Sequence, residues 1–215
     1  MTDRPFYLLI QDEIERRANQ SDADLLRDLE LLSPLPDEHV WFGITGRGNP
    51  AWDEPETEQQ LITFLATAGL VAERKLREGV SLLLEKASYG DKGETMRGLR
   101  HALEKAYAPD WSDLAEVCIK AAQHKRPGTR LWAIHELGIL RDPRALSILF
   151  DAIYDRAYLV RDRAIPALSM VIRAQTPLAP EVKLRIETLA SYHQYIHHEL
   201  QTLIAEINEN AESED

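Results

Sequence analysis

The sequence predicts an all-α protein whose central part is a solenoid of stacked helical hairpins. Apolar residues recur at helical spacing along most of the 215-residue chain. One helical sequence pattern also returns after about 30 residues. A period of this length holds two helices, which bury their apolar faces by stacking on neighbouring pairs. The two observations together predict a helical solenoid.

The first two predicted helices form a hairpin at the N-terminal end. Residues 5–18 carry one apolar face, and Ser21 is placed to cap a second helix that extends to about residue 32. Asp24 follows at the position from which a carboxylate can return a capping hydrogen bond. We expect this hairpin to act as a helical cap that covers the exposed end of the solenoid core.

Residues 33–56 lack helical periodicity and are rich in proline, glycine and aromatic residues. Loops of this length inside a domain tend to be functional or partly structured. Two interpretations remain open for Trp41, Phe42 and Trp52. They either fold back onto the end of the helical stack or form a docking loop that anchors a partner.

Helical periodicity resumes at residue 57, where Thr57 and Gln60 form a capping-box pattern, and continues to residue 87. Gly69 indicates a division into two helices, although a single long helix also fits. A turn at 89–94 precedes a predicted helix over 95–107. Beyond the repeats, helices are expected over 181–192 and 195–208.

The repeated pattern is clearest between residues 127 and 172. When PGTRLWAIHELGIL (127–140) is set above YLVRDRAIPALSMV (158–171), Arg130 falls on Arg161 and Leu137 falls on Leu168. The stretch between the two copies, residues 141–155, predicts a further helix that begins with Asp142 as N-cap and Pro143 at the first helical position.

The pattern DPRALSILFDAIYD, followed by an arginine (Arg161) six residues after Asp155, resembles HEAT repeats of the phycobilisome-lyase type. The resemblance covers about residues 94–190 and implies a right-handed α-solenoid of HEAT-like hairpins. In such repeats the arginine reaches an aspartate of the linking turn and ties neighbouring units together. His124 stands where the aspartate before Arg130 is expected, so we expect this tie to be absent at Arg130.

Composition and charge divide the chain into three parts. These are an N-terminal hairpin with the aromatic loop (1–56), the HEAT-like repeats (57–208) and an acidic tail (209–215). Residues 1–56 carry thirteen acids against five bases, and residues 175–215 carry eight against two, whereas the middle is mildly basic. Acidic ends of this kind attract basic partners and accelerate their association.

A single cysteine, Cys118, excludes an intramolecular disulfide and is expected to be a buried thiol in a reducing compartment. The apolar run near the N-terminus is too short for a secretory signal, and no run of some 18 apolar residues occurs elsewhere. These features predict a cytoplasmic protein.

Histidines offer weak candidates for metal chemistry. His193 and His197 are four residues apart, a spacing that can clamp a metal, but no further ligand follows. The pairs His135–Glu136 and His198–Glu199 are similar to the iron ligands of deoxyhypusine hydroxylase, a HEAT-like enzyme, yet that family needs four pairs in a different register. We predict no metal or cofactor, and expect Trp132 to lie beside His135 on the outer side of its helix.

A second enzymatic comparison is with HEAT-like alkylpurine DNA glycosylases, which use a basic groove and a catalytic aspartate. Several cations could form a basic surface here: Lys120, Lys125, Arg126, Arg141, Arg144, Arg156 and Arg163. However, the acidic ends oppose phosphate binding, and Trp111–Ser112–Asp113 is a poor match to the tandem tryptophan and aspartate of that family. A phycobilin-lyase function rests on repeat type alone, which does not determine chemistry.

The prediction is therefore a non-enzymatic protein–protein interaction module, either a small adaptor or an immunity-type inhibitor that binds a basic partner. A HEAT-like DNA-binding enzyme of the glycosylase type is the alternative. The resemblance implies that the second helix of each repeat lines the concave face, so its polar residues are the predicted contacts, followed by the loop aromatics. The predicted partner-binding residues are Arg144, Ser147, Asp151, Asp155, Trp41, Phe42 and Trp52. Membrane, nucleic-acid and small-molecule partners are not predicted.

Overall fold

The computed structural model of the protein describes residues 5–36, 50–87, 94–175, 178–192 and 202–206. Every regular element in these ranges is helical, and no strand occurs among them, which confirms the predicted all-α solenoid class. The chain forms two compact units, Met1–Val117 and Cys118–Asp215. The predicted division at residue 56 follows composition and stays a prediction.

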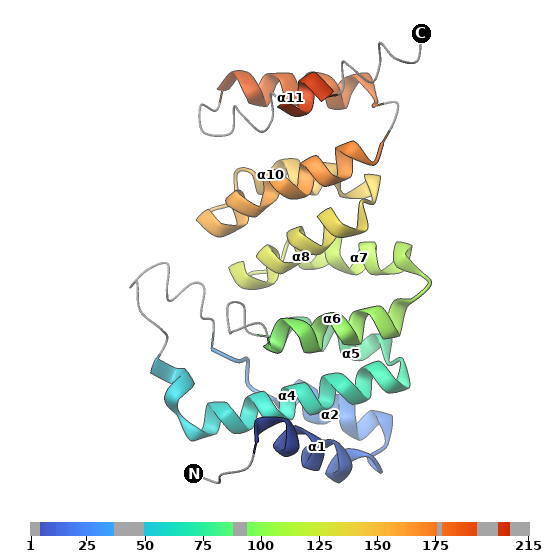
Figure 1. Ribbon diagram of the computed structural model, residues 1–215, viewed down its shortest axis with the longest axis vertical. Helices are drawn as coiled ribbons and strands as arrows, with labels where there is room; N and C mark the ends of the chain where they lie inside the picture. Colours follow the sequence, from blue (N-terminus) through green and yellow to red (C-terminus); the bar gives the residue numbers. More distant parts are fainter. Residues whose placement is uncertain (1–4, 37–49, 88–93, 176–177, 193–201, 207–215) are drawn as a thin grey trace. The chain divides into compact units, whose positions relative to one another are not determined.

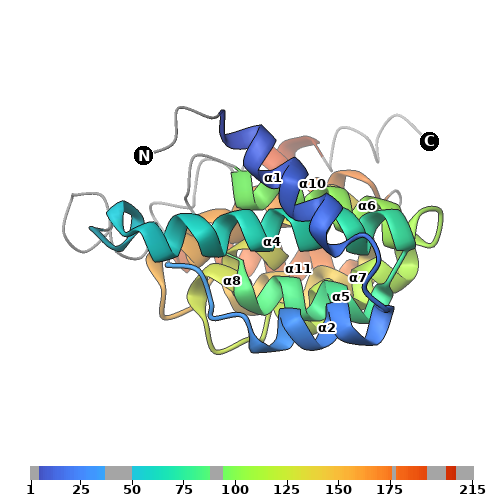
Figure 2. The same cartoon turned by 90° about the horizontal axis from the view of Figure 1, so that it is seen from below.

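The N-terminal unit is built from helical hairpins in two layers. Its elements are α1 (Phe6–Arg17), α2 (Asp22–Leu31), η1 (Pro50–Asp53), α4 (Pro55–Arg74), α5 (Arg77–Lys86), α6 (Glu94–Tyr107) and the beginning of α7 (Trp111–Ala121). Helix α1 packs on α4 while α2 packs on α5, and α6 covers the opposite side of α4 (Figures 1 and 2). The α1–α2 hairpin therefore caps the α4–α5 hairpin, as predicted.

Local sequence explains where these helices begin and end. The Ser21 hydroxyl accepts a hydrogen bond from the amide of Asp24 and so caps α2 as predicted. Helix α4 begins at Pro55, two residues before the predicted start, and ends at Lys75 in the left-handed conformation with φ of 55°. The periodic stretch from residue 57 to residue 87 does form two helices, but they divide between Arg74 and Arg77 and not at Gly69, which lies inside α4.

The C-terminal unit contains the two clear repeats. Its elements are the end of α7, α8 (Pro127–Leu140), η2 (Pro143–Ala145), α9 (Leu146–Ala152), α10 (Tyr158–Arg173) and α11 (Pro180–Tyr192). Helices α8 and α10 lie side by side (Figure 1). The residues at equivalent positions in the repeat, such as Leu137 and Leu168, are both fully buried.

A glycine allows α8 and α10 to pack closely. A Cβ atom added at Gly138 would lie 2.8 Å from the Cα of Ala167, which is backbone and cannot rotate away. At Gly69 of α4 the nearest atom to such a Cβ is the side-chain Cδ1 of Ile14 at 3.7 Å, an ordinary contact. Of these two glycines, only Gly138 is required by packing.

Helix α8 is buried on nearly all sides, although its sequence predicts an outer side. Trp132 is only 1 % exposed, so its predicted place on the outer side of the helix is wrong. Its indole Nε1 has no hydrogen-bond partner among the described residues. His135 is half-buried, and its Nδ1 lies 3.5 Å from a guanidinium nitrogen of Arg163. The apolar surface of Trp132 outweighs the cost of its unpaired N–H in the core.

Cys118, the first residue of the C-terminal unit, is fully buried, as predicted. Burial raises the pKa of its thiol far above the ordinary value, and the negative charge of Glu136 adds to the shift. A thiol that stays protonated is a poor nucleophile. Cys118 therefore serves as a small apolar side chain of the core.

Candidate protein-binding surface

An arginine buried at the N-terminus of α8 joins two linking turns of the C-terminal unit. Arg130 forms a bidentate ion pair with Asp155, with Nε–Oδ2 and Nη2–Oδ1 distances of 2.7 and 2.8 Å. The two side chains are 7 % and 14 % exposed. Paired hydrogen bonds of this geometry are among the stronger polar contacts in proteins. The predicted absence of a tie at Arg130 is therefore wrong.

The same hydrogen-bond pattern recurs in the next repeat. Arg130 Nη1 donates to the carbonyls of His124 and Lys125, and Arg161 Nη1 donates to those of Asp155 and Arg156. Each arginine thus closes the turn that precedes its own helix. The carboxylate of Asp155, six residues before Arg161, pairs with Arg130 of the preceding repeat and not with Arg161. The sequence pattern places the partner of each arginine six residues before it, which is why the prediction was wrong for Arg130.

His124 replaces aspartate within its own turn. Its Nδ1 accepts a hydrogen bond from the amide of Arg126 at 3.2 Å, while the Asp155 carboxylate accepts one from the amide of Ala157 at 2.7 Å. Both side chains thereby satisfy a turn amide two residues on. Unlike Asp155, a neutral imidazole brings no charge that could pair with an arginine.

The electrostatics of Asp155 follow from this environment. Burial alone would raise the pKa of its carboxyl group, but the hydrogen bonds from Arg130 and from the Ala157 amide outweigh burial, so the pKa is lowered. Asp155 is thus an ionised, structural carboxylate.

The exposed side of α9, with the η2 turn before it, is the best-formed candidate surface in this unit. Arg144, Ser147 and Asp151 are exposed or half-exposed, while Leu149 and Phe150 on the opposite side are buried in the core. We call these three residues the α9 face. Because the side chains of the α9 face do not pack in the core, they can be substituted without disturbing the fold.

Two neighbours orient the α9 face. Asp142 caps η2 by accepting the amide of Arg144 and also pairs with the Arg144 guanidinium at 2.6 Å. Asp151 pairs with Arg185 of α11 at 3.2 Å, and the Arg185 guanidinium lies 4.3 Å from the ring centre of Phe150. Both ion pairs lie at the surface, so they orient the side chains more than they stabilise the fold.

The remaining predicted site residues have different outcomes. Asp155 follows the α9 face closely in sequence, but its carboxylate forms an ion pair with Arg130. Trp41 and Phe42 lie outside the described residues, and Trp52 lies in η1 with its side chain outside the description. His193 and His197 also lie outside it, and within the described ranges no three His, Cys, Asp or Glu side chains gather as metal ligands.

The sequence model of the HEAT-repeat family matches residues 80–169, from α5 into α10. Residues 80–169 are HEAT-like repeats. The matched region contains both copies of the Arg130 and Arg161 pattern and the helix that carries the α9 face. No curated protein matches the chain significantly. Within the described part of the chain, no helix combines the length and apolar character that a membrane span requires.

Proposed function

We propose that this HEAT-like repeat protein is a non-enzymatic protein-binding module and that the α9 face is its principal contact surface. HEAT repeats generally mediate protein–protein interaction. The observation that carries the proposal is the division of α9 into a fully buried apolar side and a solvent-facing polar side with both charge signs. A helix of this kind presents side chains on a rigid support, which suits recognition.

The partner is a basic protein, and the module acts as an adaptor or as an immunity-type inhibitor in the cytoplasm. The excess of acids in residues 1–56 and 175–215 supports this choice of partner, because a negative potential accelerates association with a positive protein. The single reduced cysteine supports the compartment. The aromatic residues Trp41, Phe42 and Trp52 supply a second anchor, since large aromatics often dominate binding energy.

Affinity capture from an extract of the protein's own cells at low salt tests the proposal. The wild-type protein is expected to retain a basic partner, and Asp151→Arg to lose it. The matched control is Glu104→Arg, because Glu104 is also an exposed acid paired with an arginine, Arg100. Retention of the partner by Asp151→Arg, or equal loss with Glu104→Arg, would contradict the assignment of the α9 face.

A further inference from the structure

Two neighbouring turns bring cations together at one edge of the C-terminal unit. The α7–α8 turn and the α9–α10 turn are bound to each other, because Arg156 Nη2 donates to the carbonyl of Lys125 at 3.1 Å. The ion pair between Arg130 and Asp155 holds the same two turns from the inside. Lys125 and Arg156 are exposed, and Arg126 is half-buried beside them.

The sequence around these two turns contains few acidic residues. Residues 121–131 contain no acid, and within 153–163 the two acids are Asp155, which Arg130 neutralises, and Asp162. Helices α8 and α10 begin at this edge without an acidic residue in their first turns, so their dipoles add potential of the same sign. The sequence of the two turns therefore carries an excess of positive charge, although the whole chain has a net charge of −11.

Exposed aromatic rings accompany the charge. Tyr154 and Tyr158 flank the α9–α10 turn with exposed fractions of 61 % and 66 %. The guanidinium of Arg161 lies 5.8 Å from the centre of the Tyr158 ring, and the same guanidinium is fixed by the two carbonyls of the turn. Tyr158 is thus held in place at the surface. Tyrosine and arginine together are among the residue types most enriched in the energetic centres of protein interfaces.

We propose that this edge, with Lys125 and Arg156 as its exposed cations and Tyr154 and Tyr158 as its exposed rings, binds an acidic segment of a partner protein. Arginine and lysine side chains recognise acidic motifs through charge-assisted hydrogen bonds to carboxylates, and the tyrosine rings cover the apolar parts of such a segment. A nucleic acid is disfavoured because its affinity depends on summed positive charge, whereas this chain has a net charge of −11. This basic edge is separate from the α9 face, and its function does not depend on the function proposed there.

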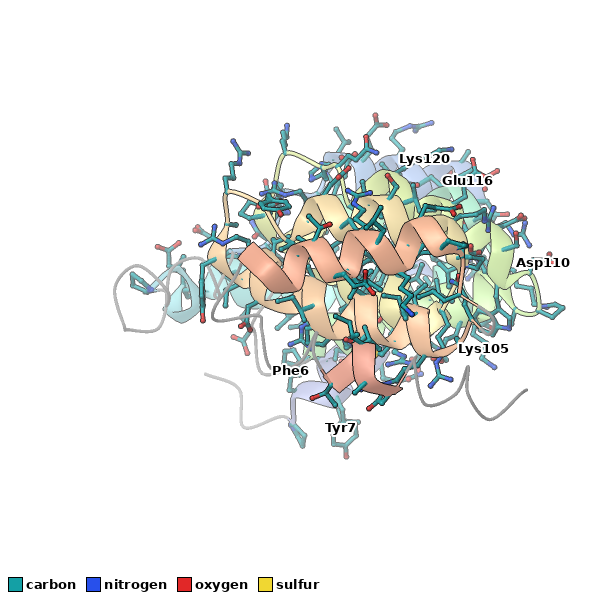
Figure 3. All side chains as sticks on the ribbon, turned by 90° about the horizontal axis from the view of Figure 1, so that it is seen from above. Phe6, Tyr7, Lys105, Asp110, Glu116 and Lys120 are labelled. Carbon is teal, nitrogen blue, oxygen red and sulfur yellow. The ribbon has the colours of Figure 1, made fainter. Side chains whose placement is uncertain are left out.

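Fluorescence anisotropy of a fluorescein-labelled oligoglutamate peptide tests the proposal on the full chain. We expect binding that weakens as salt rises, and about tenfold or greater weakening in the double variant Lys125→Glu/Arg156→Glu. The matched control is Lys105→Glu/Lys120→Glu, which makes the same change in net charge at exposed lysines of α6 and α7 (Figure 3). This control is expected to bind within about twofold of the wild type.

The tyrosine is tested with an equally exposed counterpart. Tyr158→Ser is expected to weaken the peptide severalfold, whereas Tyr7→Ser on α1 is expected to have no effect, although Tyr7 is 67 % exposed (Figure 3). Circular dichroism confirms that each variant is folded before binding is measured. Equal weakening by both double variants, no binding of oligoglutamate, or tighter binding of labelled oligothymidylate would each overturn the proposal. If the variants of the basic edge still retain the cellular partner of the α9 face in the affinity capture, the function proposed for that face stands whatever the peptide result.

Discussion

Both units tie their turns together with arginines, but they do so at different depths and with different regularity. In the N-terminal unit, two arginines flank the α4–α5 turn and reach in opposite directions. Arg74 binds the carbonyls of Ala18 and Gln20 and the carboxylate of Asp22, while Arg77 binds Asp110, Asp113 and the carbonyl of Ala106. These arginine side chains are 21 % and 41 % exposed.

In the C-terminal unit the corresponding tie is buried, and its carbonyl contacts recur from one repeat to the next. The difference teaches that a repeat is recognisable in sequence where its polar contacts are buried and periodic. The more exposed arginine contacts of the N-terminal unit also join its turns, but they stabilise the folded state less and do not recur at a fixed spacing in the sequence. Four predictions test this comparison.

The largest effect is expected for Arg130→Met. The substitution leaves the Asp155 carboxylate buried without its counter-charge, which costs about 3–5 kcal/mol in the free energy of unfolding. Arg77→Met, the control in the exposed network, is expected to cost much less because solvent screens its partners. Urea unfolding followed by circular dichroism measures both. Equal losses would show that burial does not distinguish the two ties.

The pH dependence of unfolding tests the same buried pair. Because the pKa of Asp155 is lowered on folding, the unfolded chain binds the proton first as the pH falls. The pair therefore stabilises fully above the unfolded value of about 4 and loses its contribution as the pH falls further. The double variant Arg130→Met/Asp155→Leu should lose less stability than the wild type between about pH 5 and about pH 3. Parallel curves for the two proteins would contradict the assignment.

Glycine packing should give effects of opposite sign in the two units. Gly138→Ala forces a methyl group against the backbone of α10 and is expected to cost about 1–3 kcal/mol. Gly69→Ala meets only an ordinary contact and should gain up to about 1 kcal/mol from its higher helix propensity. Thermal unfolding compares the two variants. A stabilising Gly138→Ala would show that α8 and α10 are less closely packed than described.

The smallest effects are expected where the two units are alike. Lys75 and Arg141 end α4 and α8 in the left-handed conformation, both with φ of 55°, where a side chain is strained. Lys75→Gly and Arg141→Gly should each raise the free energy of unfolding by at most about 1 kcal/mol. Differential scanning calorimetry can resolve shifts of this size. A loss in either variant would mean that the replaced side chain contributes more than its backbone strain costs.

Much of the fold could be predicted because it depends on local rules. Helical periodicity and the caps at Ser21 and Asp142 are properties of adjacent residues, and the structure confirms them. Gly69 was ambiguous because a glycine weakens a helix without ending it when packing supports both sides. The position of Trp132 was predicted wrongly because α8 packs against α10 and is buried on nearly all sides, which the local pattern does not reveal.

The candidate site was predictable only in part, for the same reason. The helical spacing of Arg144, Ser147 and Asp151 in the sequence suffices to predict a common solvent-facing side, which η2 and α9 together form. The pairing of Arg130 with Asp155, 25 residues ahead, depends on how one hairpin packs on the next. A clue was present in the sequence, since Arg130 and Arg161 occupy equivalent positions but only one is preceded by an aspartate at the expected distance.

The buried thiol of Cys118 can report the opening of the C-terminal unit. As the sequence's sole cysteine, it can react with an alkylating reagent only when its helix separates from the core. The labelling rate in native buffer, read by mass spectrometry, therefore measures how often this unit opens, without any probe having to be introduced. A partner that binds and stabilises this unit should slow the alkylation of Cys118, so the labelling rate also serves as a binding assay.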